Sequence, residues 1–359
     1  MNSKITTYLA SAIFLFLASC SAPAGEKETA SMKDEVQPIA IAIHGGAGNL
    51  KKLNLTPGEE EEYKRTLEEA LVKGNSILSS GGKALDAVEA AIHVLEDSPL
   101  FNAGKGAVFT HDGTNELDAS IMDGSNLLCG AIAGVKHIQN PISLARAVME
   151  KSDFVFLSGK GAEQFAASQG IPLVDSSYFY TENRWKQLQE NLREDTGATK
   201  KDISRDQGVI GEGKFGTVGC VALDKFGNIA AGTSTGGTSN KRYGRIGDSP
   251  VIGAGTYADN LTCAVSCTGK GEDFIRHAVA YDISAQMRYS GISLDSAVYS
   301  TIHQKLKASG GRGGCIALDR KGNVSMQFTT TGMYRGYIVN GAAPKVMIYR
   351  EPGDTLGVR

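Results

Sequence analysis

Two stretches of the chain repeat one pattern, and this repeat is the strongest constraint on the fold. Residues 219–229 align without gaps on residues 314–324, and each copy reads as a strand, an Asp-x-x-Gly-Asn turn and a second strand. The turn glycine suits the left-handed backbone that tight hairpins require. Helical patterns at about 272–289 and 294–307 separate the two predicted hairpins. This order favours antiparallel sheets covered by helices over an alternating βα barrel.

The segment before the first hairpin contains a strand and a helix with clear boundaries. Residues 39–43 alternate β-branched and small residues and end at His44 and a glycine cluster. Thr56-Pro57-Gly58-Glu59 has the form of a capping box, and apolar residues then recur at helical spacing. By contrast, residues 178–215 are polar and charged, which is typical of a surface linker that tolerates a chain break.

The N-terminal residues have the composition of a targeting segment. Lys4 precedes an apolar run too short to span a bilayer, and Leu17-Ala18-Ser19-Cys20 resembles the lipobox of bacterial lipoproteins. We therefore expect a lipoprotein signal peptide at 1–19, lipidation of Cys20, a flexible tether at 20–38 and a single domain at 39–359. The alternative is an ordinary signal peptide with a fortuitous cysteine. The expected localisation is the bacterial cell envelope, lipid-anchored and facing the periplasm, with the lipid as the only membrane contact.

Charge and cysteine content exclude several classes of partner. The formal net charge of −2 gives no electrostatic reason to expect nucleic acid as a partner. The cysteines other than Cys20 lie among apolar neighbours, without the paired spacing of a zinc site. We expect them to be structural thiols.

Thr217 begins a strand pattern directly after the polar linker. If the peptide bond before it is cut, Thr217 carries both a hydroxyl nucleophile and a free α-amine whose pKa is about 7.7–8.0. Such a residue catalyses amide hydrolysis without a histidine, and none of the histidines here falls in a Ser-His-Asp or Cys-His pattern. The alternative is an ordinary strand threonine, favoured by β-propensity.

Two glycine-bounded loops carry groups that suit an amino-acid ligand. In residues 244–250, Arg245 could bind a carboxylate and Asp248 an ammonium group, although an internal Arg–Asp pair is the alternative. In residues 268–272, the Thr268 hydroxyl and the backbone amides could receive an oxyanion. The alternative there is a turn entering a helix, with Thr268 as its cap.

Together, the motifs of the chain resemble those of one family. The segments that carry the likeness are 44–48, 100–106, 116–124, 216–219, 234–237, 244–250 and 268–272, in that order. From about residue 39 to residue 349, the sequence is similar to the isoaspartyl peptidase/L-asparaginase family, the plant-type asparaginases among the N-terminal nucleophile hydrolases. The resemblance implies an α+β fold, a four-layer αββα sandwich.

The resemblance also implies roles for individual residues. The precursor is expected to cut itself between Gly216 and Thr217, giving an α chain that ends at 216 and a β chain that starts at 217. Thr217 would be the nucleophile, Thr235 would assist it, and Thr268 and Gly269 would form the oxyanion hole. Arg245 and Asp248 would hold the substrate's α-carboxylate and α-amino groups, with Thr268, Gly269 and Gly271 in the same substrate loop.

Further expectations from the family concern ions and assembly. No cofactor is required, and some members bind a structural sodium ion through backbone carbonyls, here those of Leu95, Glu96, Phe101, Ala103 and Lys105. The cleaved αβ units usually pair as a homodimer. Two departures stand out, because many bacterial relatives have Asp at the position of Gly216 and a small or neutral residue at that of Lys270.

The expected activity is hydrolysis of β-aspartyl (isoAsp) dipeptides and of L-asparagine. One alternative within the fold is a glycosylasparaginase, which cuts GlcNAc–Asn. Another, from a different class, is a non-catalytic lipoprotein that retains the fold as a ligand-binding module.

Overall fold

Two β-sheets packed face to face form the centre of the fold in the computed structural model, which describes residues 37–197 and 216–351. The larger sheet has the order β12 (Lys345–Tyr349), β11 (Gly332–Val339), β1 (Ala40–Gly48), β5 (Thr217–Leu223), β6 (Ile229–Thr235), β2 (Leu117–Asp123), β3 (Cys129–Val135) and β4 (Phe156–Ser158). The smaller sheet has the order β10 (Val324–Phe328), β9 (Gly313–Asp319), β8 (Cys263–Gly269) and β7 (Thr256–Ala258). Neighbouring strands are antiparallel except for β3 and β4.

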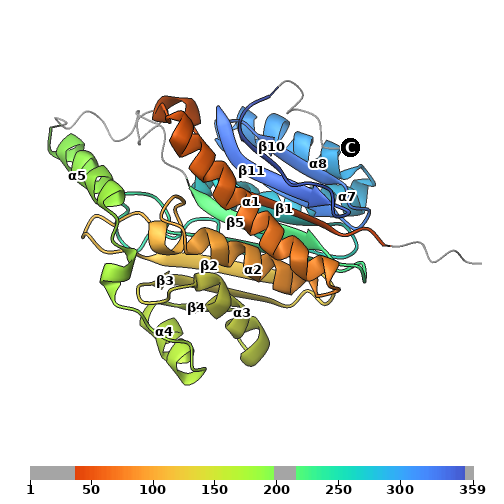
Figure 1. The fold of residues 1–359 in the computed structure, drawn as a ribbon, viewed down its shortest axis with the longest axis horizontal. Helices are drawn as coiled ribbons and strands as arrows, with labels where there is room; N and C mark the ends of the chain where they lie inside the picture. The colour runs from red at the N-terminus through yellow and green to blue at the C-terminus, as the bar shows by residue number, and fades with distance from the viewer. Residues whose placement is uncertain (1–36, 198–215, 352–359) are drawn as a thin grey trace, which may run out of the picture. The chain divides into compact units, whose positions relative to one another are not determined.

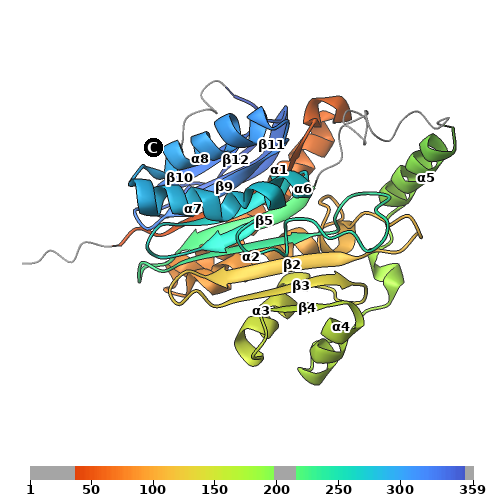
Figure 2. The ribbon, with the colours of Figure 1, turned by 180° about the vertical axis from the view of Figure 1, so that it is seen from behind.

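Helices cover the outer face of each sheet. On the larger sheet lie α1 (Pro57–Ser79), α2 (Ala84–Glu96) and α3 (Pro141–Lys151), with α4 (Gly159–Ser168) beside β3 and β4. On the smaller sheet lie α6 (Gly271–His277), α7 (Val279–Ser290), α8 (Leu294–Tyr299) and the π-helical η4 (Ser300–Leu306). The first group faces the viewer in Figure 1, and the second appears from behind in Figure 2. The αββα sandwich expected from the family is confirmed.

The remaining elements are short or lie apart from the sheets. They are η1 (Leu50–Leu53), η2 (Gly104–Gly106), η3 (Ser176–Phe179) and α5 (Glu182–Gly197). The helix α5 occupies part of the predicted linker at 178–215, and residues 198–215 lie outside the described part of the chain.

Successive side chains along a strand point to opposite faces of its sheet, and the apolar side chains form three layers. One side of the larger sheet packs against α1, α2 and α3, and the other side packs against the smaller sheet. A third cluster lies between the smaller sheet and its own helices. Val221, Ala231 and Met122 belong to the apolar cluster between the two sheets.

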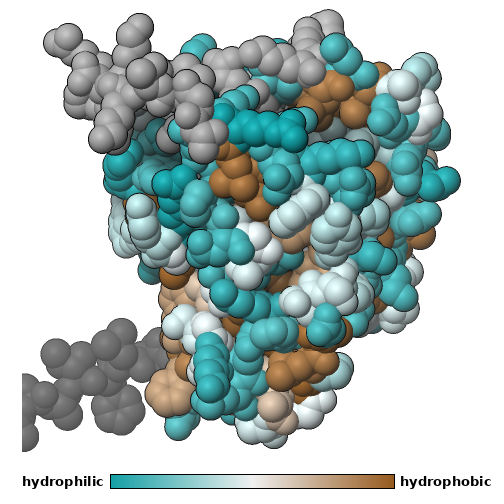
Figure 3. All heavy atoms as spheres, turned by 90° about the vertical axis from the view of Figure 1, so that its left-hand side faces the viewer, coloured by the Kyte–Doolittle hydropathy of each residue, from teal (hydrophilic) through white to brown (hydrophobic). Residues whose placement is uncertain are grey.

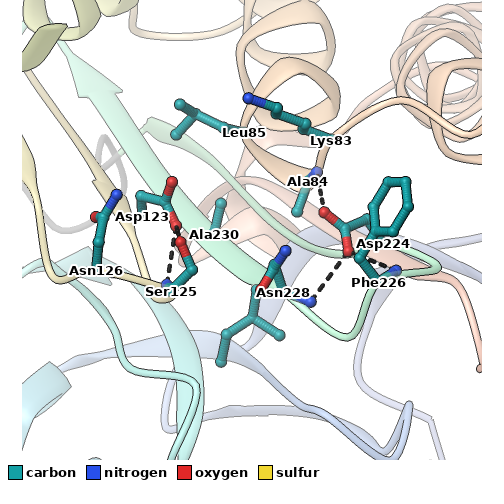
Figure 4. A pocket seen from close by; sticks show the side chains of 11 residues that line it. Lys83, Ala84, Leu85, Asp123, Ser125, Asn126, Asp224, Phe226, Asn228 and Ala230 are labelled. Atoms are coloured by element: carbon teal, nitrogen blue, oxygen red, sulfur yellow. Dashed lines mark hydrogen bonds between the residues drawn. The ribbon is translucent and has the colours of Figure 1, made fainter.

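Both predicted hairpins are confirmed. In the first, β5 and β6 pair from Thr217–Thr235 to Leu223–Ile229, and Gly227 has φ +77°. The turn is held by Asp224, whose Oδ1 accepts from the amides of Phe226 and Asn228 at 2.9 and 3.0 Å. Asp224 Oδ2 also accepts from the Ala84 amide at 3.1 Å and thereby caps α2 (Figure 4). This turn is at the opposite end of β5 from Thr217.

The helical predictions are partly wrong in detail. The capping box of Thr56 and Glu59 at the start of α1 is confirmed. The pattern at 272–289, however, is split into α6 and α7 at Ala278, which has φ +45°. The pattern at 294–307 begins as α8 and continues as η4.

Candidate active site

Thr217 and Thr235 form a pair of hydroxyls at one end of the larger sheet. Thr217 is the first residue of β5 and is paired in register with Thr235, the last residue of β6. Directly opposed residues point to the same face of a sheet, here the face toward the smaller sheet. The Thr217 hydroxyl donates to Thr235 Oγ1 at 3.1 Å, and the Gly237 amide donates to the same oxygen at 3.0 Å. Both threonines are nearly buried.

Asp118 continues this row into β2, where it is paired with Thr235. Its Oδ1 accepts from the Gly134 amide at 2.8 Å, and its Oδ2 has no hydrogen-bond partner among the described residues. Burial raises the pKa of Asp118, and the charge of Lys241 opposes that effect. The sequence placed Asp118 in a motif without giving it a role, because its proximity to Thr235 arises only from strand register.

Thr268 and Gly269 end the neighbouring strand of the smaller sheet, β8. The Ala47 amide, near the end of β1, donates to Thr268 Oγ1 at 3.3 Å. Gly269 has φ +155°, and a Cβ there would lie 2.4 Å from the Arg312 carbonyl oxygen. Side chains alternate along a strand, so Thr268 points into the same inter-sheet space as Ser266, two residues earlier. The predicted oxyanion residues therefore lie at the same end of the sandwich as Thr217.

Arg245, Asp248 and Gly271 converge, although Gly271 is distant from the other two in sequence. A Cβ on Gly271 would lie 2.9 Å from both Arg245 Nη2 and Asp248 Oδ1. Arg245 donates to the two carboxylate oxygens of Glu272 at 2.9 and 3.1 Å. Asp248 is 5% exposed, and its Oδ2 has no hydrogen-bond partner in the described part of the chain. The arrangement leaves a buried carboxylate beside a positioned guanidinium.

The electrostatics of this pair suit a zwitterionic ligand. Burial raises the pKa of Asp248 to about 7, against the lowering effects of a backbone hydrogen bond and of the Arg245 charge. Although burial alone would raise the pKa of Glu272, its hydrogen bonds to Arg245 hold that pKa below its ordinary value. An incoming ammonium group would restore the charged form of Asp248 by replacing lost hydration.

Asn102 joins the site to the loop after α2, and sequence reasoning gave it no individual role. Its side-chain amide donates to the Gly237 carbonyl at 2.7 Å, and its main-chain carbonyl accepts from the Gly236 amide at 3.1 Å. A Cβ on Gly216 would lie 3.0 Å from Asn102 Cβ. Asn102 thus contacts the residues before Thr217 and after Thr235. The only indication of a role for Asn102 in the sequence was its position in the family motif at 100–106.

The predicted cation loop runs from Leu95 and Glu96 at the end of α2 through Phe101 and Ala103 to Lys105. The loop folds back tightly, because a Cβ on Gly104 would lie 2.3 Å from the Glu96 carbonyl oxygen. A Cβ on Gly106 would likewise lie 2.0 Å from the Phe101 carbonyl oxygen. Main-chain carbonyl oxygens are suitable ligands for a hard cation. The sodium site expected in this loop stays a prediction.

Thr217 and Asp118 lie where β5 and β2 begin, and these ends of the two strands are on the left in Figure 1. Seen from that side, the described surface is mostly hydrophilic, with small hydrophobic clusters (Figure 3).

Three relatives show how much of the chain the likeness covers. The chain is 50% identical over 319 residues to the isoaspartyl peptidase of Escherichia coli, with 89% of this chain and 98% of the relative aligned. It is 49% identical to the isoaspartyl peptidase of Salmonella typhimurium, over 87% and 98% of the two chains. It is 41% identical to the isoaspartyl peptidase/L-asparaginase of Rattus norvegicus, over 84% and 87%.

The expected localisation at a bacterial cell envelope is wrong, because these relatives contradict it. They align over most of their own length, and their names describe peptidases and asparaginases, not lipoproteins. A short apolar run followed by a cysteine is a weaker indication of localisation than these alignments. Cys20 and the predicted signal peptide lie outside the described residues. Within residues 37–197 and 216–351, no helix has the length and apolar composition of a membrane span.

A family model described as "Asparaginase" matches residues 36–348. The matched range contains every site residue described above, from the glycine cluster after His44 to the loop at 268–272. With relatives at 41–50% identity over most of their length, the chain belongs to the asparaginase family, which includes the isoaspartyl peptidases.

Proposed function

We propose that this protein is an autocleaving threonine hydrolase that acts as an isoaspartyl peptidase and L-asparaginase. The observation that carries the proposal is the position of Thr217, at the first residue of a strand and 3.1 Å from the Thr235 hydroxyl. The convergence of Arg245, Asp248 and Gly271 supports an α-amino acid group as the ligand. The names of the relatives support the same activity.

The first reaction is maturation. The Thr217 hydroxyl oxygen attacks the carbonyl carbon of Gly216, the bond from that carbon to the Thr217 nitrogen breaks, and the nitrogen takes the hydroxyl proton. Water then hydrolyses the resulting ester. The products are a carboxylate at Gly216, a free α-amine at Thr217 and a restored Thr217 hydroxyl.

The second reaction is hydrolysis of the substrate. Arg245 binds the α-carboxylate and Asp248 the α-ammonium group, which places the β-carbonyl near Thr217. The Thr217 amine takes the hydroxyl proton, and the oxygen attacks the β-carbonyl carbon. Thr268 and the Gly269 amide stabilise the oxyanion, and the leaving amine or ammonia departs with a proton. Water hydrolyses the β-aspartyl ester and releases aspartate.

Two finer proposals concern the loop after α2 and the assembly. We propose that the carbonyls of Leu95, Glu96, Phe101, Ala103 and Lys105 bind a structural sodium ion, which would fix the loop that carries Asn102. We also propose that two cleaved units form a homodimer, on the strength of the family relationship alone. Thermal unfolding in sodium against choline salts tests the first, and light scattering of the purified protein tests the second.

The decisive experiment compares the wild-type protein with Thr217→Ala and Thr217→Ser. Mass spectrometry of the wild type should show two fragments that meet at the Gly216–Thr217 bond, and the protein should release aspartate from isoAsp-Leu. Thr217→Ala should stay one chain without turnover, whereas Thr217→Ser should retain part of both activities. A wild-type chain that remains intact and inactive would reject the proposal. Faster turnover of GlcNAc–Asn than of isoAsp-Leu would instead indicate a glycosylasparaginase.

A further inference from the structure

A row of polar side chains crosses the space between the two sheets, one pleat below Thr217. In the larger sheet, His44, Gly219, Thr233 and Ser120 are successive partners in register across β1, β5, β6 and β2. In the smaller sheet, Ser266 and Thr256 are partners across β8 and β7. We call the five side chains of these residues the inter-sheet polar row: His44, Ser120, Thr233, Thr256 and Ser266.

All five side chains are fully buried and joined by hydrogen bonds. His44 Nε2 lies 3.0 Å from Ser266 Oγ, which lies 2.6 Å from Thr233 Oγ1. Thr256 donates to Thr233 at 2.6 Å, and Ser120 lies 2.8 Å from Thr256. Burying so many polar groups is costly unless each is hydrogen-bonded. An apolar layer would fill the same space, as it does one pleat further along at Val221, Ala231 and Met122.

The two ends of the row contact the two halves of the active site. At one end, His44 Nδ1 lies 3.0 Å from the carbonyl oxygen of Thr217. At the other end, Ser120 donates to the carbonyl oxygen of Ser249 at 2.6 Å. Ser249 directly follows Asp248. The row therefore connects the main chain of the nucleophile to the main chain of the substrate-binding loop.

The chemistry of these contacts fixes the tautomer of His44. A carbonyl oxygen only accepts, so Nδ1 must carry the proton that is donated to Thr217. Burial lowers the pKa of His44 to about 3, against the opposing effect of the hydrogen bond to Thr217. The ring is therefore neutral, and its Nε2 accepts a hydrogen bond from the Ser266 hydroxyl. In this state His44 is a fixed donor to Thr217 and does not act as an acid or base.

Gly219 provides the space in which this arrangement forms. A Cβ at Gly219 would lie 2.0 Å from Ser266 Oγ and 2.4 Å from His44 Nε2. No side chain larger than hydrogen therefore fits beside the His44–Ser266 bond. The glycine two residues after Thr217 is thus explained by the contact between His44 and Ser266.

We propose that the inter-sheet polar row is a positioning device for Thr217, in which His44 fixes the Thr217 carbonyl and the hydroxyls fix His44 relative to the Asp248 loop. The inference rests on the proposed function of Thr217 as nucleophile. A strand's first residue has no preceding strand residue to hold it, and after cleavage its amine end is free. A reacting atom displaced by about 1 Å can lose about 10²-fold in rate. A rigid hold on the Thr217 carbonyl would prevent such a displacement.

The test compares two substitutions of His44 that keep different halves of the ring's contacts. In His44→Asn, the side-chain amide nitrogen occupies about the position of Nδ1 and can still donate to Thr217. In His44→Gln, the amide reaches the position of Nε2 and contacts Ser266, but the donor to Thr217 is lost. His93→Asn is the matched control, because His93 on α2 is 2.6 Å from Ser143 and outside the row. For each protein, the rate of self-cleavage, kcat and KM for isoAsp-Leu, and thermal unfolding are measured.

We expect His44→Gln to slow self-cleavage and to lower kcat about 10²-fold, with KM changed less than about threefold. His44→Asn should recover most of both rates, and His93→Asn should match the wild type. A merely structural role for His44 would lower the folded fraction without this difference between Asn and Gln.

Equal rates in His44→Gln and the wild type, with both proteins folded, would overturn the positioning role and leave the proposed function intact. A wild-type protein without self-cleavage or turnover would instead reject the proposed function. If His44→Gln does not fold, Ser266→Ala decides the matter by removing a single hydroxyl. We expect this variant to lower kcat about tenfold; an unchanged kcat would overturn the inference.

Discussion

Glu272 holds Arg245 along one side of the guanidinium group. The Nε and Nη2 atoms of Arg245 donate to the two carboxylate oxygens of Glu272 at 2.9 and 3.1 Å. A guanidinium carries five N–H donors, so the edge formed by Nη1 and Nη2 stays available for a second carboxylate. The ion pair therefore holds the Arg245 side chain in place and leaves one edge of its guanidinium group for the carboxylate of a ligand.

This orientation predicts a specific defect in substrate binding. In Glu272→Gln, one of the two charge-assisted hydrogen bonds is lost and Arg245 becomes mobile. We expect KM for isoAsp-Leu to rise about tenfold, with kcat changed little. Arg245→Lys should raise KM further, because an ammonium group cannot bind a carboxylate bidentately. Steady-state kinetics of the cleaved variants provide the measurement, and a lowered kcat at constant KM would contradict the assignment.

The contact between Thr217 and Thr235 predicts an effect on the chemical step. Thr235→Val keeps the shape of the side chain but removes the hydroxyl that accepts from Thr217. We expect kcat to fall about 10²-fold while KM stays close to the wild-type value. Thr235→Ser is the control and should retain most of the activity. Single-turnover rates would separate this effect from slow product release, and an unchanged rate in Thr235→Val would exclude a role for the hydroxyl.

Asp248 predicts a pH dependence of catalysis. With its pKa raised to about 7 by burial, the carboxyl becomes neutral below that pH and loses its attraction for the substrate's ammonium group. We expect kcat/KM to fall about 100-fold per pH unit below about pH 7, about tenfold from protonation of Asp248 and about tenfold from protonation of the Thr217 amine, since kcat/KM reports the free enzyme. In Asp248→Asn, kcat/KM should be low and should retain only the pH dependence of the Thr217 amine. A wild-type profile that matches this variant's profile would contradict the prediction.

Glu96 predicts a pH dependence of stability. Burial raises its pKa from 4.5 to about 8, against the lowering effects of the nearby Ser234 side chain and of the hydrogen bond that the Ile142 amide donates. The folded state therefore holds a proton that the unfolded state releases between those pH values. The corresponding stabilisation is fully present below pH 4.5 and is lost as the pH rises through about 8. Denaturant unfolding of the uncleaved Thr217→Ala protein should show this decline, and adding Glu96→Gln should flatten it. Identical slopes in the two proteins would contradict the prediction.

The sequence predicted the fold where local chemistry determines the structure. The Asp-x-x-Gly-Asn turns gave both hairpins, because an aspartate that accepts from turn amides and a glycine with positive φ act within a few residues. The split at Ala278 was not predictable, because the apolar spacing continues across it and alanine rarely adopts positive φ. The change from α8 to the π-helical η4 was likewise not predicted from the apolar spacing.

The site was predictable where single residues carry the chemistry, and less so where strand register brings residues together. Thr217, Arg245 and Asp248 were candidates from their own segments, and the family resemblance gave them roles that stay predictions. The partnership of Arg245 with Glu272 was missed, because the expected alternative was Asp248, three residues away. The contact of His44 with Thr217 joins residues from two strands that are distant in sequence. Only the three-dimensional pairing of β1 with β5 places them together.

The strand order of the larger sheet has a consequence for how the mature protein folds. A cut before Thr217 assigns β1, β2, β3 and β4 to one fragment and β5, β6, β11 and β12 to the other. Because β1 lies between β11 and β5, neither fragment contains the larger sheet as a continuous set of strands, whereas the whole smaller sheet stays in the second fragment. The intact precursor folds in a unimolecular reaction, whereas the two fragments, once denatured, can regain the larger sheet only by associating. The proposed self-cleavage would therefore change the molecularity of folding, and refolding of the cleaved protein would depend on concentration.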